Sequence, residues 1–299
     1  MRRFLVFCLY GPRCSWGEVA VGEERASLGH PGRSAVLGLV AGALGLRRDQ
    51  EDDLLALDAS LGLAVRVFSP GRPLTDFHTV EMPKARRGVS HPTRRAELIA
   101  AHAQDDNPML SFREYRQDAL YLACLWETQA QPPWPLEAIG QALEYPVFAP
   151  YLGRKSCPPG LPLAPKLVEA EGVRQALAQE RGRTREDELA RLISRPPGHL
   201  VWEESAGEWD ADLRDLKHDR FSRRDRLLSR RRWQYLPRGE ARAAWSAPTG
   251  QEVGACISAA WNWPPCPPQP PSSGGPGATP TPCTTWCGSC SATAPNAAA

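Results

Sequence analysis

Hydrophobic and polar positions divide roughly the first 245 residues into short apolar segments joined by polar stretches. Residues 4–10 are apolar and rich in aromatic and branched side chains, which is typical of a buried strand that Gly11-Pro12 would close. Ser34 stands before the apolar run 35–46, which predicts a buried helix with Ser34 as its N-cap. Further patterns predict a helix at 49–61, a helix at 135–143 with Pro135 in its first turn, and strands at 63–68, 74–80, 109–115 and 119–126.

The order of these elements predicts an α+β fold. Strand, helix, strand, long excursion, strand, helix and terminal strand match a ferredoxin-like or RNA-recognition-motif layout. The polar stretch 81–108 is long for a loop, so it is either functional or disordered, and five cations favour a functional role: Lys84, Arg86, Arg87, Arg94 and Arg95. We therefore predict one such domain over residues 1–160, with an inserted thumb-like hairpin over about 68–108.

A smaller β-containing region is predicted over residues 161–245. The polar stretch 166–195 suggests two helices or an insertion. Some of four aromatic residues are expected to pack the remainder of this region: Trp202, Trp209, Phe221 and Trp233.

The composition changes abruptly near residue 246, where lysine and arginine disappear and Pro, Gly, Ser, Thr and Cys predominate. The spacing Cys283-x3-Cys287-x2-Cys290 resembles zinc ligation, but no histidine or second spaced cysteine pair completes such a site. Residues 246–299 are otherwise interpreted as a disordered tail or as an out-of-frame translation. The out-of-frame translation is favoured, because back-translation with suitable codons and a shift of frame yields a plausible first segment of another protein. We expect no metal and no cofactor.

The net charge of +2 over 299 residues excludes a generic nucleic-acid coat protein, but the charge is unevenly distributed. The run from Arg220 to Arg232 is rich in arginine, which fits a solvated face or a contact with backbone phosphates. The apolar run 35–46 would form a helix about 18 Å long, too short for about 30 Å of hydrocarbon, and no signal-peptide cleavage site follows the N-terminus. We therefore expect a cytoplasmic protein whose cysteines before the tail are reduced: Cys8, Cys14, Cys124 and Cys157.

The segment 151–158, Tyr-Leu-Gly-Arg-Lys-Ser-Cys-Pro, carries the most specific chemistry. Gly153 permits a close backbone approach, Arg154 can bind a phosphate with two donors, and Lys155 and Ser156 add a charge and a hydroxyl. The first turn of the helix after Ser34, with Arg33 beside it, is a second place suited to a phosphate. A basic surface turn is the alternative interpretation of 151–158.

Six motifs in a fixed order resemble the CasD family, the subunit of the type I-E CRISPR Cascade complex that holds the 5′ handle of CRISPR RNA. The motifs lie at 10–17, 31–39, 44–49, 76–80, 113–118 and 151–158, and residues 165–245 match more weakly. The family usually has threonine at the position of Gly32. The resemblance implies a modified RNA-recognition fold of the RAMP superfamily, binding of CRISPR RNA, and contacts with the CasC backbone and the large subunit CasA.

These motifs define the candidate RNA-binding residues: Trp16, Arg33, Ser34, His78, Arg113, Tyr115, Arg154, Lys155 and Ser156. The cations would meet phosphates and the rings would stack on or hydrogen-bond to splayed bases. Packing roles remain open for Trp16 and Tyr115, a structural role for His78, and an ion pair with Asp118 or Glu114 for Arg113. A metal-independent endoribonuclease using His78 with Lys84 or Lys155 is the alternative function, and a scaffold that contacts only proteins is a third.

Overall fold

The structure is a computed structural model that describes residues 1–18, 20, 23–80, 83, 87–103, 109–179, 198–246 and 248. These residues fall within one compact unit, residues 1–257. The predicted tail 246–299, apart from residues 246 and 248, lies outside the described part, as do Lys84, Arg86 and the segment 180–197.

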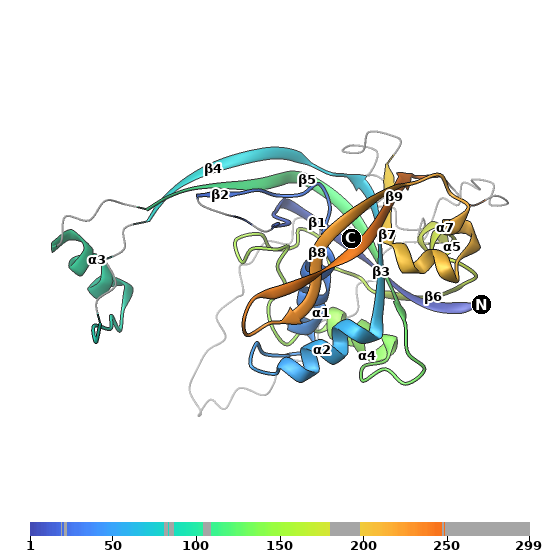
Figure 1. The fold of residues 1–299 in the computed structure, drawn as a ribbon, viewed down its shortest axis with the longest axis horizontal. Helices are drawn as coiled ribbons and strands as arrows, with labels where there is room; N and C mark the ends of the chain where they lie inside the picture. The colour runs from blue at the N-terminus through green and yellow to red at the C-terminus, as the bar shows by residue number, and fades with distance from the viewer. Residues whose placement is uncertain are drawn as a thin grey trace, which may run out of the picture. The chain divides into compact units, whose positions relative to one another are not determined.

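Nine strands among the described residues form one sheet with the order β6-β1-β5-β3-β7-β9-β8, to which β2 and β4 add by pairing with β5 (Figure 1). All pairings are antiparallel except that of β2 with β5. The predicted mixed α and β class is thereby confirmed, and strands from both predicted regions, 1–160 and 161–245, share the sheet. The strands are β1 (Arg2–Cys14), β2 (Glu24–Arg25), β3 (Leu61–Ser69), β4 (Arg72–Val80), β5 (Met109–Glu127), β6 (Lys166–Ala170), β7 (His199–Glu203), β8 (Asp219–Ser229) and β9 (Gln234–Ala244).

Both faces of the sheet centre are buried, which explains why residues 4–10 of β1 are continuously apolar. Leu5, Phe7 and Leu9 join a core with residues of α1, α2 and α4, whereas Phe4, Val6 and Cys8 join a second core with residues of α5, η1 and α7. The helices are α1 (Arg33–Ala43), α2 (Glu51–Ser60), α3 (Arg94–Ala103), α4 (Leu136–Glu144), α5 (Val173–Gln179), the 3-10 helix η1 (Glu204–Glu208) and α7 (Ala211–Arg214). No described helix has the length and apolar character needed to cross a bilayer.

Several predicted boundaries were wrong because strand pairing overrides local sequence signals. Gly11-Pro12 does not end β1, which continues to Cys14 through its pairing with β5. The predicted strands at 109–115 and 119–126 are one strand, β5, which passes through Asp118 at a φ of 54°. The start of the stretch 166–195 is strand β6 rather than helix, because it pairs with β1.

Two predicted helix starts were also wrong. Gly32, not Ser34, is the N-cap residue of α1, and Pro135 is the N-cap of α4 rather than part of its first turn. Of the four aromatic residues predicted to pack 161–245, Trp202 is buried and Trp209 packs against the core, whereas Phe221 and Trp233 are exposed.

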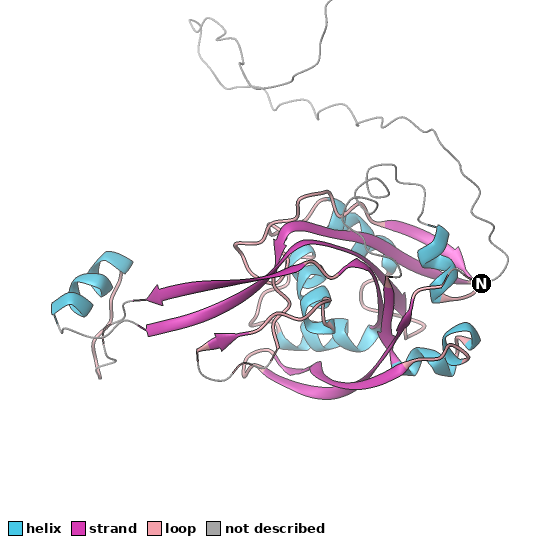
Figure 2. Cartoon of the chain, turned by 90° about the horizontal axis from the view of Figure 1, so that it is seen from above, coloured by secondary structure: helices cyan, strands magenta, loops and turns pink. Residues whose placement is uncertain are grey.

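Strand β4 and the first half of β5 form a two-stranded ribbon that leaves the rest of the sheet (Figures 1 and 2). β4 pairs with residues 109–117 of β5, whereas residues 116–127 of β5 pair between β1 and β3. Side chains along β4 alternate between exposed and half-buried, as expected for a ribbon with one open face. β4 and α3 lie within the segment 68–108 that was predicted as an inserted hairpin, whereas residues 109–117 of β5, which pair with β4, lie just beyond it.

Candidate nucleic-acid interface

The turn at 152–157 is closed by its own backbone and fixed against the residue after β1. The N–H of Leu152 donates to the carbonyl of Cys157 at 2.7 Å, and the N–H of Cys157 donates to the carbonyl of Arg154 at 2.9 Å. The N–H of Ser15 donates to the carbonyl of Leu152 at 3.1 Å. Leu152 and Cys157 are buried and therefore hold the turn on the core, while Lys155 and Ser156 remain exposed.

Gly153 is required for this geometry. Its φ is +84°, and a Cβ at this position would lie 1.7 Å from the carbonyl oxygen of Ser15. Residues other than glycine rarely adopt such a φ, and none could share the space with a backbone oxygen. The glycine therefore allows the two cations that follow it to project from a rigid base.

Arg154 is positioned by an aromatic ring and a carbonyl. Its guanidinium carbon lies 4.7 Å from the centre of the Tyr115 ring, and its Nη2 donates to the carbonyl of Arg25 at 3.3 Å. These contacts leave the side chain half-buried. A cation held over an aromatic face loses less conformational freedom when it binds an anion, so Arg154 is pre-oriented for a phosphate.

We name the surface formed by Arg13, Arg25, Arg154 and Lys155 the basic turn. Arg13 is exposed, and its charge, like that of Arg154, acts on the Cys157 thiol. Burial raises the pKa of Cys157 above its usual value, and the Ser156 hydroxyl and these two cations only partly offset that rise. Sequence reasoning missed Arg13 and Arg25 because their approach to residues 151–158 depends on tertiary contacts, although Arg13 lies within the motif at 10–17.

Trp16 and Tyr115 are buried at 2% and 4% exposure, respectively. Trp16 packs edge-on against Tyr121 with ring centres 5.8 Å apart, and its backbone N–H donates to Ser27 Oγ at 3.0 Å. In this conformation neither ring presents a face on which a base could stack. The structure thus places both aromatics where the packing alternative expects them, beneath the basic turn.

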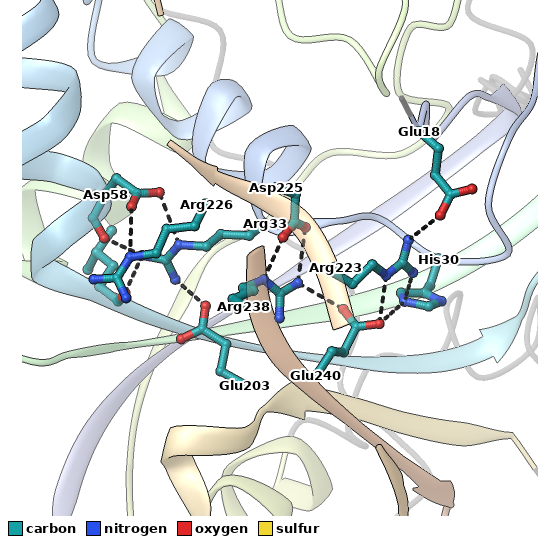
Figure 3. Close-up of polar contacts among 11 residues, drawn as sticks. Glu18, His30, Arg33, Asp58, Glu203, Arg223, Asp225, Arg226, Arg238 and Glu240 are labelled. Carbon is teal, nitrogen blue, oxygen red and sulfur yellow. Dashed lines mark hydrogen bonds and ion pairs between the residues drawn. The ribbon is translucent and has the colours of Figure 1, made fainter. Parts of the chain in front are cut away.

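Arg33 does not join the basic turn. Its side chain is 4% exposed, and its Nε contacts Asp58 Oδ1 at 3.0 Å while Nη2 donates to the carbonyl of Leu61 at 2.8 Å (Figure 3). A further ion pair joins its Nη1 to Glu203. Its guanidinium is therefore engaged within the protein and is not available to a phosphate in this conformation.

The start of α1 is occupied by a carboxylate of the same chain. Asp225 Oδ2, from β8, accepts a hydrogen bond from the backbone N–H of Arg33 at 2.7 Å. A Cβ at Gly32 would lie 2.7 Å from that oxygen, so the glycine makes room for the carboxylate. An anion does bind this helix start, as the sequence suggested, but in the structure it is a side chain and Ser34 provides no cap.

A buried charge network extends from Arg33 across β8 and β9 (Figure 3). Arg238 contacts Asp225 at 2.6 Å and Glu240 at 2.8 Å, and Arg223 contacts Glu240 at 2.9 Å. Burial alone would raise the pKa of Glu240, but the hydrogen bond and charge of His30 together with both arginines lower this pKa to about 2. The network therefore ties the β8–β9 hairpin to α1 and α2.

His199 gives this region a pH dependence. Burial, followed by the charges of His30 and Arg242, lowers the pKa of His199 to about 4 from 6.5. The folded protein keeps the imidazole neutral, so stability is present above pH 6.5 and is lost as the pH falls toward 4. Because the ring is partly exposed, we expect this loss to be about 1–2 kcal/mol.

Substitution of His199 measures this contribution. Both proteins are unfolded with urea at pH 7 and at pH 4.5. We expect the drop in unfolding free energy between these two pH values to be about 1–2 kcal/mol smaller for His199→Phe than for the unmodified chain. An identical loss in both proteins would contradict the assignment.

His78 and Arg113 lie on the β4–β5 ribbon. His78 Nε2 contacts Asp76 Oδ2 at 2.7 Å, and Arg113 Nε donates to Ser111 Oγ at 3.3 Å. Arg113 is aligned with Asp76 on β4 and with Arg25 on β2, which places it beside the basic turn. His78 is aligned with Ser111, farther out along the ribbon.

The fold and the basic turn define a mixed α/β protein with a cationic surface turn. Residues 4–236 match the family model described as CRISPR-associated protein Cas5. The chain is 32% identical over 187 residues to the CRISPR system Cascade subunit CasD of Escherichia coli (strain K12), covering 59% of this chain and 76% of that protein. The chain therefore belongs to the Cas5 family of CRISPR-associated proteins, and its resemblance to CasD is confirmed.

One solved structure supports the fold. A chain of a CRISPR RNA-guided surveillance complex aligns with a TM-score of 0.50 at 24% identity, covering 82% of this chain and 91% of that one. The crystal structure of a Cas protein aligns at a TM-score of 0.47 and 22% identity, covering 81% and 94%.

Proposed function

We propose that the protein is a Cascade subunit that binds the 5′ handle of CRISPR RNA through the basic turn. The observation that carries this proposal is the Gly153 turn, whose glycine-specific backbone conformation and buried anchors hold Arg154 and Lys155 at the surface. Membership of the Cas5 family and the similarity to the Cascade subunit CasD support the choice of RNA as the polyanion.

Within this proposal the residues take different roles. Arg154, Lys155 and Ser156 contact phosphates directly, and the exposed cations Arg13 and Arg25 lie beside them. Arg113 and His78 extend the surface along the ribbon, toward nucleotides that flank the turn. Trp16 and Tyr115 support the turn from below.

The finer features of the fold belong to the same proposal. The sheet with its helices is a modified RNA-recognition fold, and the β4–β5 ribbon with α3 is its thumb-like hairpin. The CasC backbone and CasA are the proposed protein neighbours, and the cytoplasm is the proposed location. Co-purification with the other Cascade subunits and CRISPR RNA tests assembly, and a chain ending near residue 245 tests the effect of the tail.

Removing the two central cations tests RNA binding. We expect the double variant Arg154→Ala, Lys155→Ala to bind labelled handle RNA at least about tenfold more weakly and to lower the salt slope of log K by about 1.4, or 0.7 for each phosphate contact. The unmodified chain, with about five such contacts, should lose about a hundredfold in affinity between 50 and 200 mM salt. Fluorescence anisotropy over this salt range measures both quantities.

A matched control is the double variant Arg220→Ala, Arg224→Ala, which removes two exposed cations from β8, away from residues 151–157. Its affinity for handle RNA should stay within about threefold of that of the unmodified chain. If loss of Arg154 and Lys155 leaves both the affinity and the crosslinking to handle RNA unchanged, the basic turn serves protein contacts and the scaffold interpretation prevails.

We further propose that the subunit binds without catalysis. The endoribonuclease alternative rests on His78, whose imidazole pairs with Asp76 on the ribbon, whereas Lys155 stands on the basic turn and Lys84 lies outside the described residues. We expect repeat RNA to stay intact when it is incubated with the purified protein in EDTA. Cleavage that disappears in His78→Ala would instead establish a nuclease.

A further inference from the structure

We propose that the tip of the β8–β9 hairpin is a second site for single-stranded nucleic acid, separate from the basic turn. In this site Arg231 and Arg232 bind phosphates while a base stacks on a platform made by Trp233, Arg48 and Arg230. The tip belongs to the arginine-rich run 220–232, which the basic turn does not include.

The arginines of this run face two ways. Arg223 points into the buried network and contacts Glu240, whereas Arg224, next to it on β8, is exposed. Beyond the last residue of β8, Arg231 and Arg232 are both exposed. No side-chain hydrogen bond or ion pair of Arg232 occurs within the described part of the chain, so its charge is available to a ligand.

Trp233 is held exposed beside these arginines. Its side chain is 54% exposed, and its backbone has a φ of 54°, a left-handed conformation that is uncommon for a bulky residue. The guanidinium carbons of Arg48 and Arg230 each lie 4.4 Å from the ring centre, and Arg230 Nη1 also donates to the hydroxyl of Tyr235 at 2.5 Å. Aromatic rings and guanidinium planes are the groups on which unpaired bases stack.

An open pocket of about 620 Å³ adjoins this platform. It is a surface depression rather than an enclosed cavity, so a ligand bound there stays partly exposed to solvent. The residues that line it are Glu51, Leu228, Ser229, Arg231, Arg232 and Gln234.

The acidic group in this pocket is Glu51. A hydrogen bond from Ser229 lowers the pKa of Glu51, burial acts in the opposite direction, and the backbone N–H groups of Arg231 and Arg230 with the charge of Arg231 lower it further. Its Oε1 is buried and has no hydrogen-bond partner within the described part of the chain. This carboxylate, at the start of α2, lines the same pocket as Arg231 and Arg232, and no described ion pair joins it to Arg232. Asp52 and Asp53 in the same turn of α2 reduce the net charge, so we expect modest affinity with a marked salt dependence.

The experiment uses the full chain with fluorescein-labelled U12 RNA and T12 DNA, neither of which contains a handle sequence. We expect Arg231→Ala, Arg232→Ala to weaken binding of at least one probe about tenfold and to lower its salt slope by about 1.4. Trp233→Ala should weaken binding by about five- to 150-fold, and Trp233→Phe by less than about threefold, because a ring remains for stacking.

Three comparisons make the outcome specific. The control Arg220→Ala, Arg224→Ala should stay within about threefold of the unmodified chain. If the variants lose affinity equally for both probes, the site binds single-stranded RNA and DNA through the phosphates and bases that they share. If they lose affinity for one probe only, the site is specific for that nucleic acid. Handle RNA tested in parallel separates the two sites, because only Arg154→Ala, Lys155→Ala is expected to abolish handle preference.

The proposal would be overturned if the folded variants bind both probes within about twofold of the unmodified chain. These variants are the double variant Arg231→Ala, Arg232→Ala and the single variant Trp233→Ala. Loss of co-purification with other subunits in those same variants would then identify the tip as a protein interface. Circular dichroism melts establish that the variants are folded, and Trp233→Phe provides a second test if Trp233→Ala does not fold.

Discussion

Gly153→Ala is expected to destabilise the protein by about 3 kcal/mol or more and to remove binding of handle RNA. The new Cβ would lie 1.7 Å from the carbonyl oxygen of Ser15, and the φ of +84° would be strained even without this clash. Strain at such a φ costs about 1–3 kcal/mol for a residue other than glycine. Relief of the clash also requires the turn to move, which breaks the hydrogen bond from the Ser15 N–H to the Leu152 carbonyl. Displacement of the turn would carry Arg154 and Lys155 away from their positions.

Urea unfolding and anisotropy with handle RNA measure the two effects separately. Gly38→Ala is the matched control, because a Cβ there meets no atom within 4 Å and the residue lies inside α1. That change should leave RNA affinity unaltered and stabilise the protein by about 0.5–1 kcal/mol. A Gly153→Ala protein with unchanged stability and affinity would mean that the turn does not have the described conformation in solution.

Arg33→Met is expected to cost about 3–5 kcal/mol of unfolding free energy, because it removes the cation that contacts both Asp58 and Glu203 and leaves Asp58 only the longer contact of 4.0 Å with Arg226. Arg33→Lys should recover only part of the loss, since an ammonium group cannot reach two carboxylates and the carbonyl of Leu61 together. Denaturant titration provides the measurement, with Arg224→Met as an exposed control expected to change stability by less than about 0.5 kcal/mol.

RNA affinity distinguishes the two roles considered for Arg33. The contacts with Asp58 and Glu203 predict that folded Arg33→Lys binds handle RNA nearly as well as the unmodified chain. A strong loss of affinity with little loss of stability would restore Arg33 as a phosphate ligand.

Local pattern was sufficient for much of the fold but not for all of the candidate site. The apolar runs that became β1, β3 and α1 were recognisable because each is buried over most of its length. The glycine and two cations of 153–155 were recognisable because their chemistry is local. Continuation of β1 through Gly11-Pro12 was not, because it depends on pairing with β5, more than one hundred residues away.

The partners of Arg33 show the same limit. A helix start with a neighbouring arginine attracts an anion, and sequence cannot say whether that anion is a phosphate or a carboxylate from a distant strand. Asp225 is such a carboxylate, and only the approach of β8 to α1 reveals it. Burial of Trp16 and Tyr115 was likewise open from sequence, because an aromatic side chain can serve either core packing or base stacking.

The close approach of Gly32 and Asp225 constrains how this lineage can change. Because a side chain at position 32 would press on the carboxylate at position 225, a mutation that introduces threonine there requires the aspartate to shift or to be replaced. The two positions should therefore vary in concert among descendants, and the order of the two mutations should decide which evolutionary routes remain open.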